Sequence, residues 1–193
     1  MWGGMDLETR IRGRLDAGDP RGAATEAIRG LGPAVLRYLR AMLRDEDVAA
    51  DAFSVFAEKL WKGIASFRGE SSFRTWAFRL AWNATLDVKD DAWRRKGRRF
   101  EPGEASAMAE SIRTKSVVRT ERQRRVLEEL RASLSAEDRS LLILRVDQGL
   151  SWEEVAQVLA ESGAAARPDA LMKRYERLKE RLGKLARERG LVE

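Results

Sequence analysis

Apolar residues along this chain recur at spacings of three and four, whereas runs that alternate every second residue are nearly absent. The first spacing places side chains on one face of a helix, and the second is typical of strands. Prolines and glycines divide the helical pattern. Asp19-Pro20 predicts an N-cap followed by proline at the first helical position, and Gly32-Pro33 predicts the end of that helix. Further helices are expected over residues 34–43, 47–61 and 73–93.

The same periodicity returns in the second half of the chain after an interruption. Glu101-Pro102-Gly103 breaks the pattern, and the stretch that follows is rich in Ala, Ser and Glu. Helices are expected at 122–134, from Ser135 to Gln148, from the capping box Ser151–Glu154 to about Glu161, and over 169–189. We therefore predict an all-α fold of two small helical domains, 1–97 and 121–193, joined by a linker at 98–120. The alternative is a single domain in which the linker is one more surface helix.

Composition narrows the functions open to such a fold. Hydrophobic residues make up 44% of the 193 residues, enough for a buried core, and the formal net charge is +6. A basic chain favours a polyanionic partner, either nucleic acid or an acidic membrane face. Because the chain has no cysteine and no histidine, disulfides, thiolate metal sites, cysteine nucleophiles and histidine triads are excluded. An enzyme would therefore have to use carboxylates, lysine or tyrosine, and we expect neither an enzyme nor a cofactor or metal site.

Targeting signals are not evident in the sequence. No apolar run reaches the roughly 20 residues that a membrane span needs. Met1–Arg14 lacks an apolar core followed by a cleavage site. We expect a cytoplasmic protein that does not insert into a membrane.

The segment 66–87, SFRGESSFRTWAFRLAWNATLD, interleaves aromatic residues with arginines. Aromatic faces stack on bases and arginines neutralise phosphates, so the pattern suits melted DNA. Asn83, one helical turn beyond an arginine, could pair with an adenine edge or a phosphate. The alternative is a core stripe, because Trp76 and Leu80 share one helix face. Trp82 lies on a different face from much of that stripe, and this keeps the DNA interpretation open.

Two charged segments flank the aromatic one. In Trp93–Arg99 five of seven residues are basic, which indicates either a phosphate-binding patch or a solvated helix end. Residues 45–58 hold five acidic residues and no basic one, a composition unsuited to facing DNA. Asp47 and Asp51, one turn apart, could also be metal ligands, although two carboxylates alone are a weak indication.

The C-terminal pattern is typical of a helix-turn-helix, in which a support helix precedes a basic recognition helix. Residues 170–189 contain eight Lys or Arg against three Glu. Leucines and Tyr175 form an apolar stripe, and we expect the basic residues Lys173, Arg174, Arg177, Lys179 and Arg181 to lie mostly off it. A basic amphipathic helix could instead lie on a membrane or bind a partner helix.

The order and spacing of residues from Asp45 to Arg99 resemble region 2 of bacterial sigma factors of the extracytoplasmic-function type. The residues that carry this resemblance are Asp51, Trp61, Phe67-Arg68-Gly69, Ser72-Phe73, Thr75-Trp76, Arg79, Ala81, Asn83, Asp87 and the run Arg94–Arg99. Leu134–Leu159 and the following ALMKRYERLKERL are similar to region 4 of the same family. The resemblance implies an alternative sigma factor that binds core RNA polymerase, recognises −35 and −10 promoter elements and promotes DNA opening.

The resemblance also implies roles for individual residues. Contacts with the −10 element are implied for Phe67, Arg68, Ser71, Phe73, Arg74, Arg79, Trp82 and Asn83. Contacts with the DNA backbone are implied for Arg94, Arg95, Lys96, Arg98 and Arg99. Docking on the polymerase β′ clamp helices is implied for Asp47, Asp51, Ser54, Val55 and Glu58. Contacts with the −35 element are implied for Met172, Lys173, Arg174, Arg177 and Lys179, and Asp169 is expected to cap the recognition helix.

The β flap of the polymerase and an anti-sigma factor are further partners that the resemblance implies, although no residue identifies an anti-sigma factor. Three features depart from the family. Ser54-Val55 stands where the family often has a Gln-acid pair, Met172 often has a basic counterpart, and the turn Ala160–Asp169 is several residues longer. Two other functions stay open: a free-standing helix-turn-helix regulator, and a metal-dependent nuclease.

Overall fold

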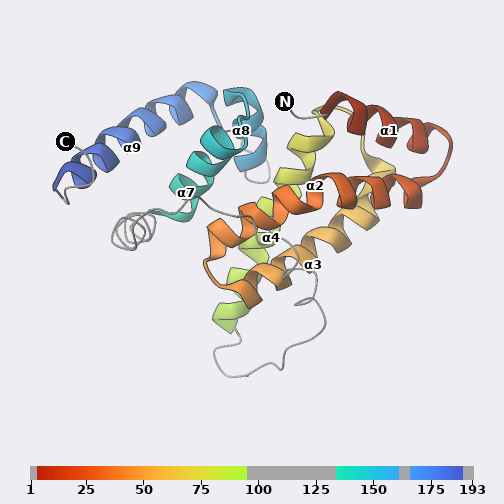
Figure 1. Ribbon diagram of the computed structural model, residues 1–193, viewed down its shortest axis with the longest axis horizontal. Helices are drawn as coiled ribbons and strands as arrows, with labels where there is room; N and C mark the ends of the chain where they lie inside the picture. The colour runs from red at the N-terminus through yellow and green to blue at the C-terminus, as the bar shows by residue number, and fades with distance from the viewer. Residues whose placement is uncertain (1–3, 95–133, 161–165, 189–193) are drawn as a thin grey trace, which may run out of the picture. The chain divides into compact units, whose positions relative to one another are not determined.

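The computed structural model describes residues 4–94, 134–160 and 166–188, and every regular element in these ranges is helical (Figure 1). The predicted all-α class is thereby confirmed. The chain divides into two compact units, residues 1–112 and 113–193. The expected linker at 98–120 and the expected helix at 122–134 fall almost entirely outside the described residues, so the domain boundaries stay a prediction. No helix of the described part is long and apolar enough to cross a membrane.

The first unit is built from α1 (Gly4–Asp16), α2 (Pro20–Leu43), α3 (Glu46–Gly63), the 3-10 turn η1 (Ile64–Ser66) and α4 (Phe73–Arg94). Consecutive helices pack on one another, and α4 also crosses α2 (Figure 1). The core contains Tyr38 and Phe78, whose rings meet edge to face at 5.5 Å. Burial of aromatic side chains therefore holds α2, α3 and α4 together.

The expected break at Gly32-Pro33 is wrong, because α2 runs through both residues without interruption. Pro33 cannot donate a hydrogen bond to the carbonyl one turn before it, which costs about 3 kcal/mol in a helix interior. The turns after it bury Val35 and Leu39 completely, and each such side chain contributes about 1.5–3 kcal/mol. Tertiary burial thus outweighs the local penalty. Gly32 adds a close approach, since a Cβ there would lie 3.5 Å from the Phe53 ring of α3.

Helix caps in the first unit follow the predicted chemistry. The backbone N–H of Gly22 donates to the Asp19 carboxylate at 2.8 Å, and the N–H of Val48 donates to Asp45 at 3.0 Å. The first of these bonds, together with one from Arg14, lowers the pKa of Asp19 below its ordinary value. The caps fix the starts of α2 and α3 by satisfying backbone donors at each helix end.

The second unit contains α7 (Ala136–Leu142), the π-helical turn η2 (Ile143–Asp147), α8 (Trp152–Leu159) and α9 (Pro168–Glu188). The helix expected up to Gln148 is therefore part α and part π, and Gln148 N–H donates to the Ile143 carbonyl. Gly149, with φ +65°, ends it as expected. The helix-turn-helix pair is α8 and α9, and α9 packs on both α7 and α8.

The predicted N-cap of α8 is correct, whereas the predicted N-cap of α9 is not. The capping box of Ser151 and Glu154 is confirmed in both directions, at 3.2 and 2.8 Å. At α9 the Arg167 carbonyl accepts from the N–H groups of Ala170 and Leu171. Asp169 therefore lies within the first turn and is not the cap. Its charge is still favourable there, because the helix dipole is positive at that end.

Pro33→Ala should stabilise the first unit. Alanine restores a backbone donor inside α2, so we expect the free energy of unfolding to rise by up to about 3 kcal/mol. Urea unfolding followed by far-UV circular dichroism measures this change. Arg37→Ala, at an exposed position of the same helix, is the control and should alter stability by less than about 0.5 kcal/mol. A lower stability of Pro33→Ala would show that the packing of α2 requires proline geometry.

Candidate nucleic-acid and protein-binding surfaces

The loop before α4 is shaped by Ser72 and Gly69. The Ser72 hydroxyl accepts from the N–H of Thr75 at 3.0 Å and lies 2.7 Å from the Thr75 hydroxyl, so Ser72 caps α4. Gly69 has φ +72°, a left-handed conformation that side chains rarely adopt. These two residues turn the chain between η1 and α4 and bring the segment 67–71 to the surface at the start of that helix.

Three aromatic rings close the base of this loop. Phe67, Phe73 and Trp76 lie with ring centroids 5.2–5.3 Å apart. Phe73 is fully buried, whereas Phe67 and Trp76 are half-buried. The cluster therefore packs chiefly on itself, and the expected contact of Phe73 with DNA is not available in this structure. Phe67 keeps part of its ring at the surface.

Trp82 belongs to the core, with only 4% of its surface exposed. The Thr85 hydroxyl donates to its backbone carbonyl at 2.7 Å. The interpretation of Trp82 as an exposed, base-contacting residue is corrected here, because the indole packs inward although it lies off the Trp76–Leu80 stripe. What α4 presents outward is Arg79, part of Asn83, and Leu86 with 38% of its surface exposed.

The remaining predicted residues of this surface differ in exposure. Arg68 is exposed and lies 4.0 Å from Glu70, while Ser71 is half-buried and donates its hydroxyl to the Ser72 carbonyl. Arg74 is half-buried, with its guanidinium 5.7 Å from the centre of the Phe78 ring. The side chains of the basic run Arg94, Arg95, Lys96, Arg98 and Arg99 lie outside the described part of the chain.

Arg12 of α1 is a candidate that the sequence reasoning missed. A Cβ placed on Gly69 would lie 3.5 Å from its Nη2 atom, so the guanidinium borders the loop. Arg10 and Arg14 pair with Glu26 of α2, whereas Arg12 pairs with Glu8 of its own helix. The four-residue spacing of Leu7, Ile11 and Leu15 is the signal that would have predicted α1 and drawn attention to its basic face.

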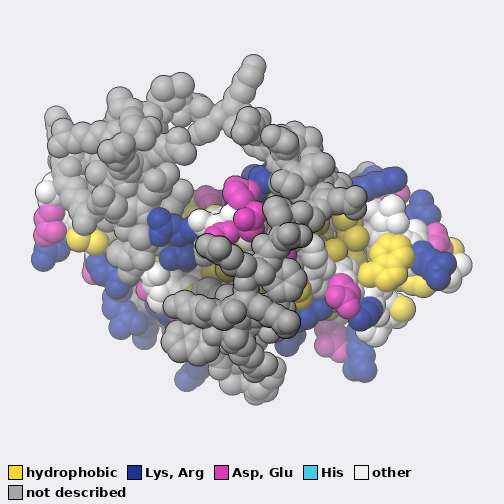
Figure 2. Space-filling model, turned by 90° about the horizontal axis from the view of Figure 1, so that it is seen from below, with side chains coloured by type: hydrophobic (Ala, Val, Ile, Leu, Met, Phe, Trp, Pro, Cys, Tyr) yellow, Lys and Arg dark blue, Asp and Glu magenta, His cyan; other side chains and the backbone are white. Residues whose placement is uncertain are grey.

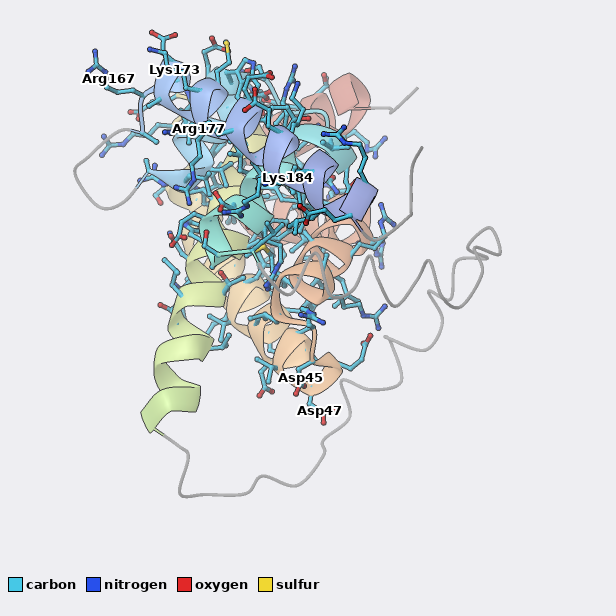
Figure 3. All side chains as sticks on the ribbon, turned by 90° about the vertical axis from the view of Figure 1, so that its left-hand side faces the viewer. Asp45, Asp47, Arg167, Lys173, Arg177 and Lys184 are labelled. Carbon is cyan, nitrogen blue, oxygen red and sulfur yellow. The ribbon has the colours of Figure 1, made fainter. Side chains whose placement is uncertain are left out.

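One side of α3 forms an exposed stripe, which comprises Asp47, Asp51, Ser54, Glu58 and Trp61. At about 100° per residue these side chains fall within an arc of about 80°. Trp61 has 48% of its surface exposed, which is unusual for a tryptophan. The predicted docking residue Val55 is half-buried and lies at the edge of the stripe. Figure 3 shows Asp45 and Asp47 together at the N-terminal end of α3.

Two lysines beside the exposed stripe are hydrogen-bonded to carboxylates, one of which belongs to the stripe. Lys62 donates to Glu58 and lowers the pKa of that carboxyl below its ordinary value. Lys59, off the stripe, donates to Asp87 of α4. Among the residues that the structure describes, no group of three or more carboxylates could hold a metal ion.

Five of the seven basic residues of α9 divide into two sets. At about 100° per residue, Lys173, Arg177 and Lys184 point about 100–160° away from the buried Leu171 and Leu178. We call them the outer face of α9 (Figure 3). Within the described residues Lys173 and Arg177 are exposed and have no ion pair. Met172, with 41% of its surface exposed, lies beside this face.

Arg174 and Arg181 form the other set, because both point to α7. Arg174 Nε donates to Asp138 at 2.6 Å and Arg181 Nη2 donates to the same carboxylate at 3.4 Å. Both arginines lie just outside the apolar stripe, on the side from which they reach α7. Arg174, an expected −35 contact, is engaged within the protein in this structure.

Lys179 is also held by its own helix. It donates to Glu176 at 2.8 Å, which raises the lysine pKa above its ordinary value, and it lies 5.2 Å from the Tyr175 ring. Tyr175 packs edge to face against Trp152 of α8 at 5.4 Å. Seen from below, Lys and Arg side chains are interspersed with Asp and Glu in the space-filling view (Figure 2). The charge that a partner meets is therefore set by individual helix faces and not by the net charge of the chain.

A helical unit with an acidic exposed stripe and an arginine-bearing loop, together with a basic helix-turn-helix, is typical of a DNA-binding protein that also has a protein partner. Comparison with known proteins agrees. Residues 27–99 match the family Sigma-70 region 2. The chain is 31% identical over 134 residues to the RNA polymerase sigma factor YlaC of Bacillus subtilis (strain 168), covering 66% of this chain and 74% of that protein.

Two further relatives extend the comparison. The ECF RNA polymerase sigma-E factor of Escherichia coli (strain K12) is 30% identical over 122 residues, covering 58% of this chain and 61% of that protein. The sigma factor RpoE of Bartonella quintana, solved in complex with the anti-sigma factor NepR, shares the fold with a TM-score of 0.62 at 20% identity. That match covers 84% of this chain and 96% of the solved one.

The chain belongs to the sigma factors of RNA polymerase, of the extracytoplasmic-function (ECF) type. Members of this family are not enzymes: they bind core RNA polymerase and promoter DNA and so direct transcription initiation. The resemblance seen in the sequence is thereby confirmed.

Trp82→Ala should impair function by destabilising the first unit. Removing this buried indole is expected to lower the free energy of unfolding by about 3–5 kcal/mol, so polymerase binding and DNA opening should fall together. Thermal unfolding and a polymerase-binding assay measure the two effects. The control is Asn83→Ala, at a partly exposed neighbouring position, which should leave thermal stability nearly unchanged and impair opening alone. If Trp82→Ala kept the wild-type melting temperature and lost only DNA opening, Trp82 would be a DNA contact and not a core residue.

Proposed function

We propose that three surfaces of this sigma factor have separate partners. The exposed stripe of α3 binds the β′ clamp helices of RNA polymerase. The loop 66–74 and the outward face of α4 bind the −10 element, and the outer face of α9 binds the −35 element. The protein acts in the cytoplasm, where the polymerase and promoter DNA are found. The observation that carries the proposal is the contrast between one exposed face of α3, which carries carboxylates, and the outer face of α9, which carries cations.

The exposed stripe of α3 has the chemistry of a protein-binding surface. Three carboxylates on one helix face, from Asp47, Asp51 and Glu58, would repel the phosphate backbone and attract a basic protein surface. Trp61 at the end of the stripe supplies a large apolar surface, and tryptophan is enriched among residues that dominate binding energy. The resemblance to region 2 supports the β′ clamp helices as the partner.

The loop surface has groups that suit an unpaired base and its phosphates. Arg68, Arg79 and the newly identified Arg12 are exposed guanidiniums around the loop. Asn83 can pair with a base edge, and the half-exposed ring of Phe67 can stack on a base. Phe73 and Trp82 support this surface from below. Binding energy at these groups offsets the few kcal/mol that flipping a base costs.

The outer face of α9 is the surface best suited to enter the major groove. Lys173 and Arg177 have free charged ends directed away from the core of the unit, and Met172 beside them can contact a thymine methyl group. The predicted contact of Lys179 is kept, although its ammonium is shared with Glu176. The second unit would also contact the β flap, as the family resemblance implies.

Regulation by an anti-sigma factor is part of the proposal. The sigma factor RpoE of Bartonella quintana, which has the same fold, is found in complex with the anti-sigma factor NepR. A protein of this kind would act by covering one of the three surfaces. Co-purification from the host, followed by identification of the bound proteins, tests this point.

Reconstituted transcription tests the main proposal. The full chain is added to core RNA polymerase with a pool of promoter-sized DNA fragments, and bound fragments are selected, sequenced and used for run-off transcription. We expect a recurring pair of elements with −35 and −10 spacing. Failure to bind core polymerase, or to direct it to any fragment, would refute the proposed function. A palindromic footprint without polymerase would favour a free-standing regulator.

Asp51→Arg should weaken binding to core polymerase. The substitution places a cation in the centre of the exposed stripe of α3, where a like charge on the partner costs affinity. We expect a decrease of at least about tenfold, which corresponds to about 1.4 kcal/mol, measured by fluorescence anisotropy. Asp16→Arg, an equal charge change at an exposed position of α1, is the control and should bind normally. Normal affinity of Asp51→Arg would move the docking surface elsewhere.

Lys173→Ala combined with Arg177→Ala should weaken binding of a −35 duplex and flatten its salt dependence. Each lost phosphate contact reduces the slope of log K against log salt by about 0.9. Titrations at several salt concentrations measure that slope. Arg37→Ala combined with Lys62→Ala, at two exposed positions of the first unit, controls for the change in net charge and should leave the slope unchanged. An unaltered slope in the double variant would place the DNA contacts on other residues.

A further inference from the structure

A compact ion-pair network joins the start of α7 to the middle of α9. Arg174 donates from Nε to Asp138 Oδ1 at 2.6 Å and from Nη2 to the Ser135 hydroxyl at 3.2 Å. Its Nη2 also lies 3.8 Å from Glu137. Arg181 donates to the other oxygen of Asp138 at 3.4 Å. One carboxylate thus receives two guanidiniums that belong to the proposed recognition helix.

Asp138 is the least exposed member of this network. Only 14% of its side chain is exposed, against 39% for Arg174 and 52% for Arg181, so solvent reaches the pairs mainly from the arginine side. The backbone N–H of Asp138 donates to Ser135 at 3.1 Å, and the same hydroxyl accepts from Arg174. The N-cap of α7 and the ion pair to α9 are therefore one hydrogen-bonded unit.

Helix geometry explains why both Arg174 and Arg181 reach Asp138. Arg174 and Arg181 are seven residues apart, which places them two turns apart on one side of α9 at about 100° per residue. That side borders Leu171 and Leu178, which are buried. A guanidinium at this edge reaches α7 across the apolar seam. The outer face of α9, which carries Lys173 and Arg177, is directed away from it.

We propose that Asp138 is a positioning residue for promoter recognition, which withholds Arg174 and Arg181 from the DNA backbone and fixes how α9 is held on α7. The proposal rests on the −35 role of α9 given above. Contacts with phosphates are independent of sequence, whereas base contacts, which the outer face can make in addition to its phosphate contacts, depend on sequence. Two free arginines would therefore raise affinity for every duplex and reduce the preference for the promoter. The carboxylate of Asp138 prevents this by occupying both.

Salt titrations of single alanine variants test which arginines touch DNA. The full chain is titrated with its selected promoter duplex and with an unrelated duplex of equal length. Arg177→Ala should reduce the salt slope by about 0.9, as expected for one lost phosphate contact. Arg174→Ala should lower affinity for the promoter duplex without altering the slope, because it loosens α9 without removing a contact. An equal loss of slope in both variants would overturn the proposal.

Asp138→Asn tests the withholding directly. Removing the charge frees both guanidiniums, so affinity for the unrelated duplex should rise severalfold and its salt slope should steepen by about one to two. The ratio of promoter to unrelated affinity should fall. Asp138→Glu keeps the charge and should restore most of that ratio. Asp147→Asn, the same charge change at an exposed position of the second unit outside this network, is the matched control and should have little effect.

The outcomes separate this proposal from the proposed function. If the wild-type chain bound duplex DNA with no salt dependence, the −35 role of α9 would fail. If Asp138→Asn left the slope and the affinity ratio unchanged, only the withholding role would fail. Should this variant be poorly folded by circular dichroism, the combination Arg174→Ala with Arg181→Ala carries the test. That double variant should keep the wild-type slope on the unrelated duplex, and a decrease of about two would overturn the proposal.

Discussion

Burial of aromatic side chains between α2, α3 and α4 is the constraint on which the first unit depends. Tyr38, Phe56, Phe73, Phe78 and Trp82 all point into this core. Each fully buried aromatic ring contributes several times the thermal energy, so no polar group of α4 can take its place. The inward direction of Phe73 and Trp82 determines that Arg79 and Asn83 face outward. The proposed DNA surface of α4 therefore consists of the side chains that do not pack in the core.

The two proposed binding surfaces on α3 and α9 carry opposite charges. The exposed stripe of α3 carries carboxylates where DNA must not bind, and the outer face of α9 carries cations where it should. With a screening length of about 8 Å at physiological salt, the charge of each surface acts locally. A chain with a modest net charge of +6 can then present an acidic surface to one partner and a basic surface to another.

The sequence alone predicted the helical class, most helix boundaries, the capping box at Ser151 and the family. It failed at Pro33, because a local breaking signal does not report the tertiary burial that outweighs it. It failed at Trp82, because spacing along a helix does not say which of several apolar faces meets α2 and α3. Arg174 was assigned to DNA because its residue type matches the role, whereas its bond to Asp138 depends on a residue 36 positions away. Pairing across such distances is not encoded in any local pattern.

Carboxylates in this protein thus have a function that composition does not reveal. Specificity is a difference between two affinities, so it can be raised by weakening the wrong complex as well as by strengthening the right one. Asp51 lies on a helix face from which it would repel DNA, and Asp138 occupies arginines that would bind any DNA. In both places a negative charge reduces binding to a competing partner. A basic recognition helix without such a carboxylate would bind promoters more tightly in isolation, yet it would distinguish them less well from the rest of the genome.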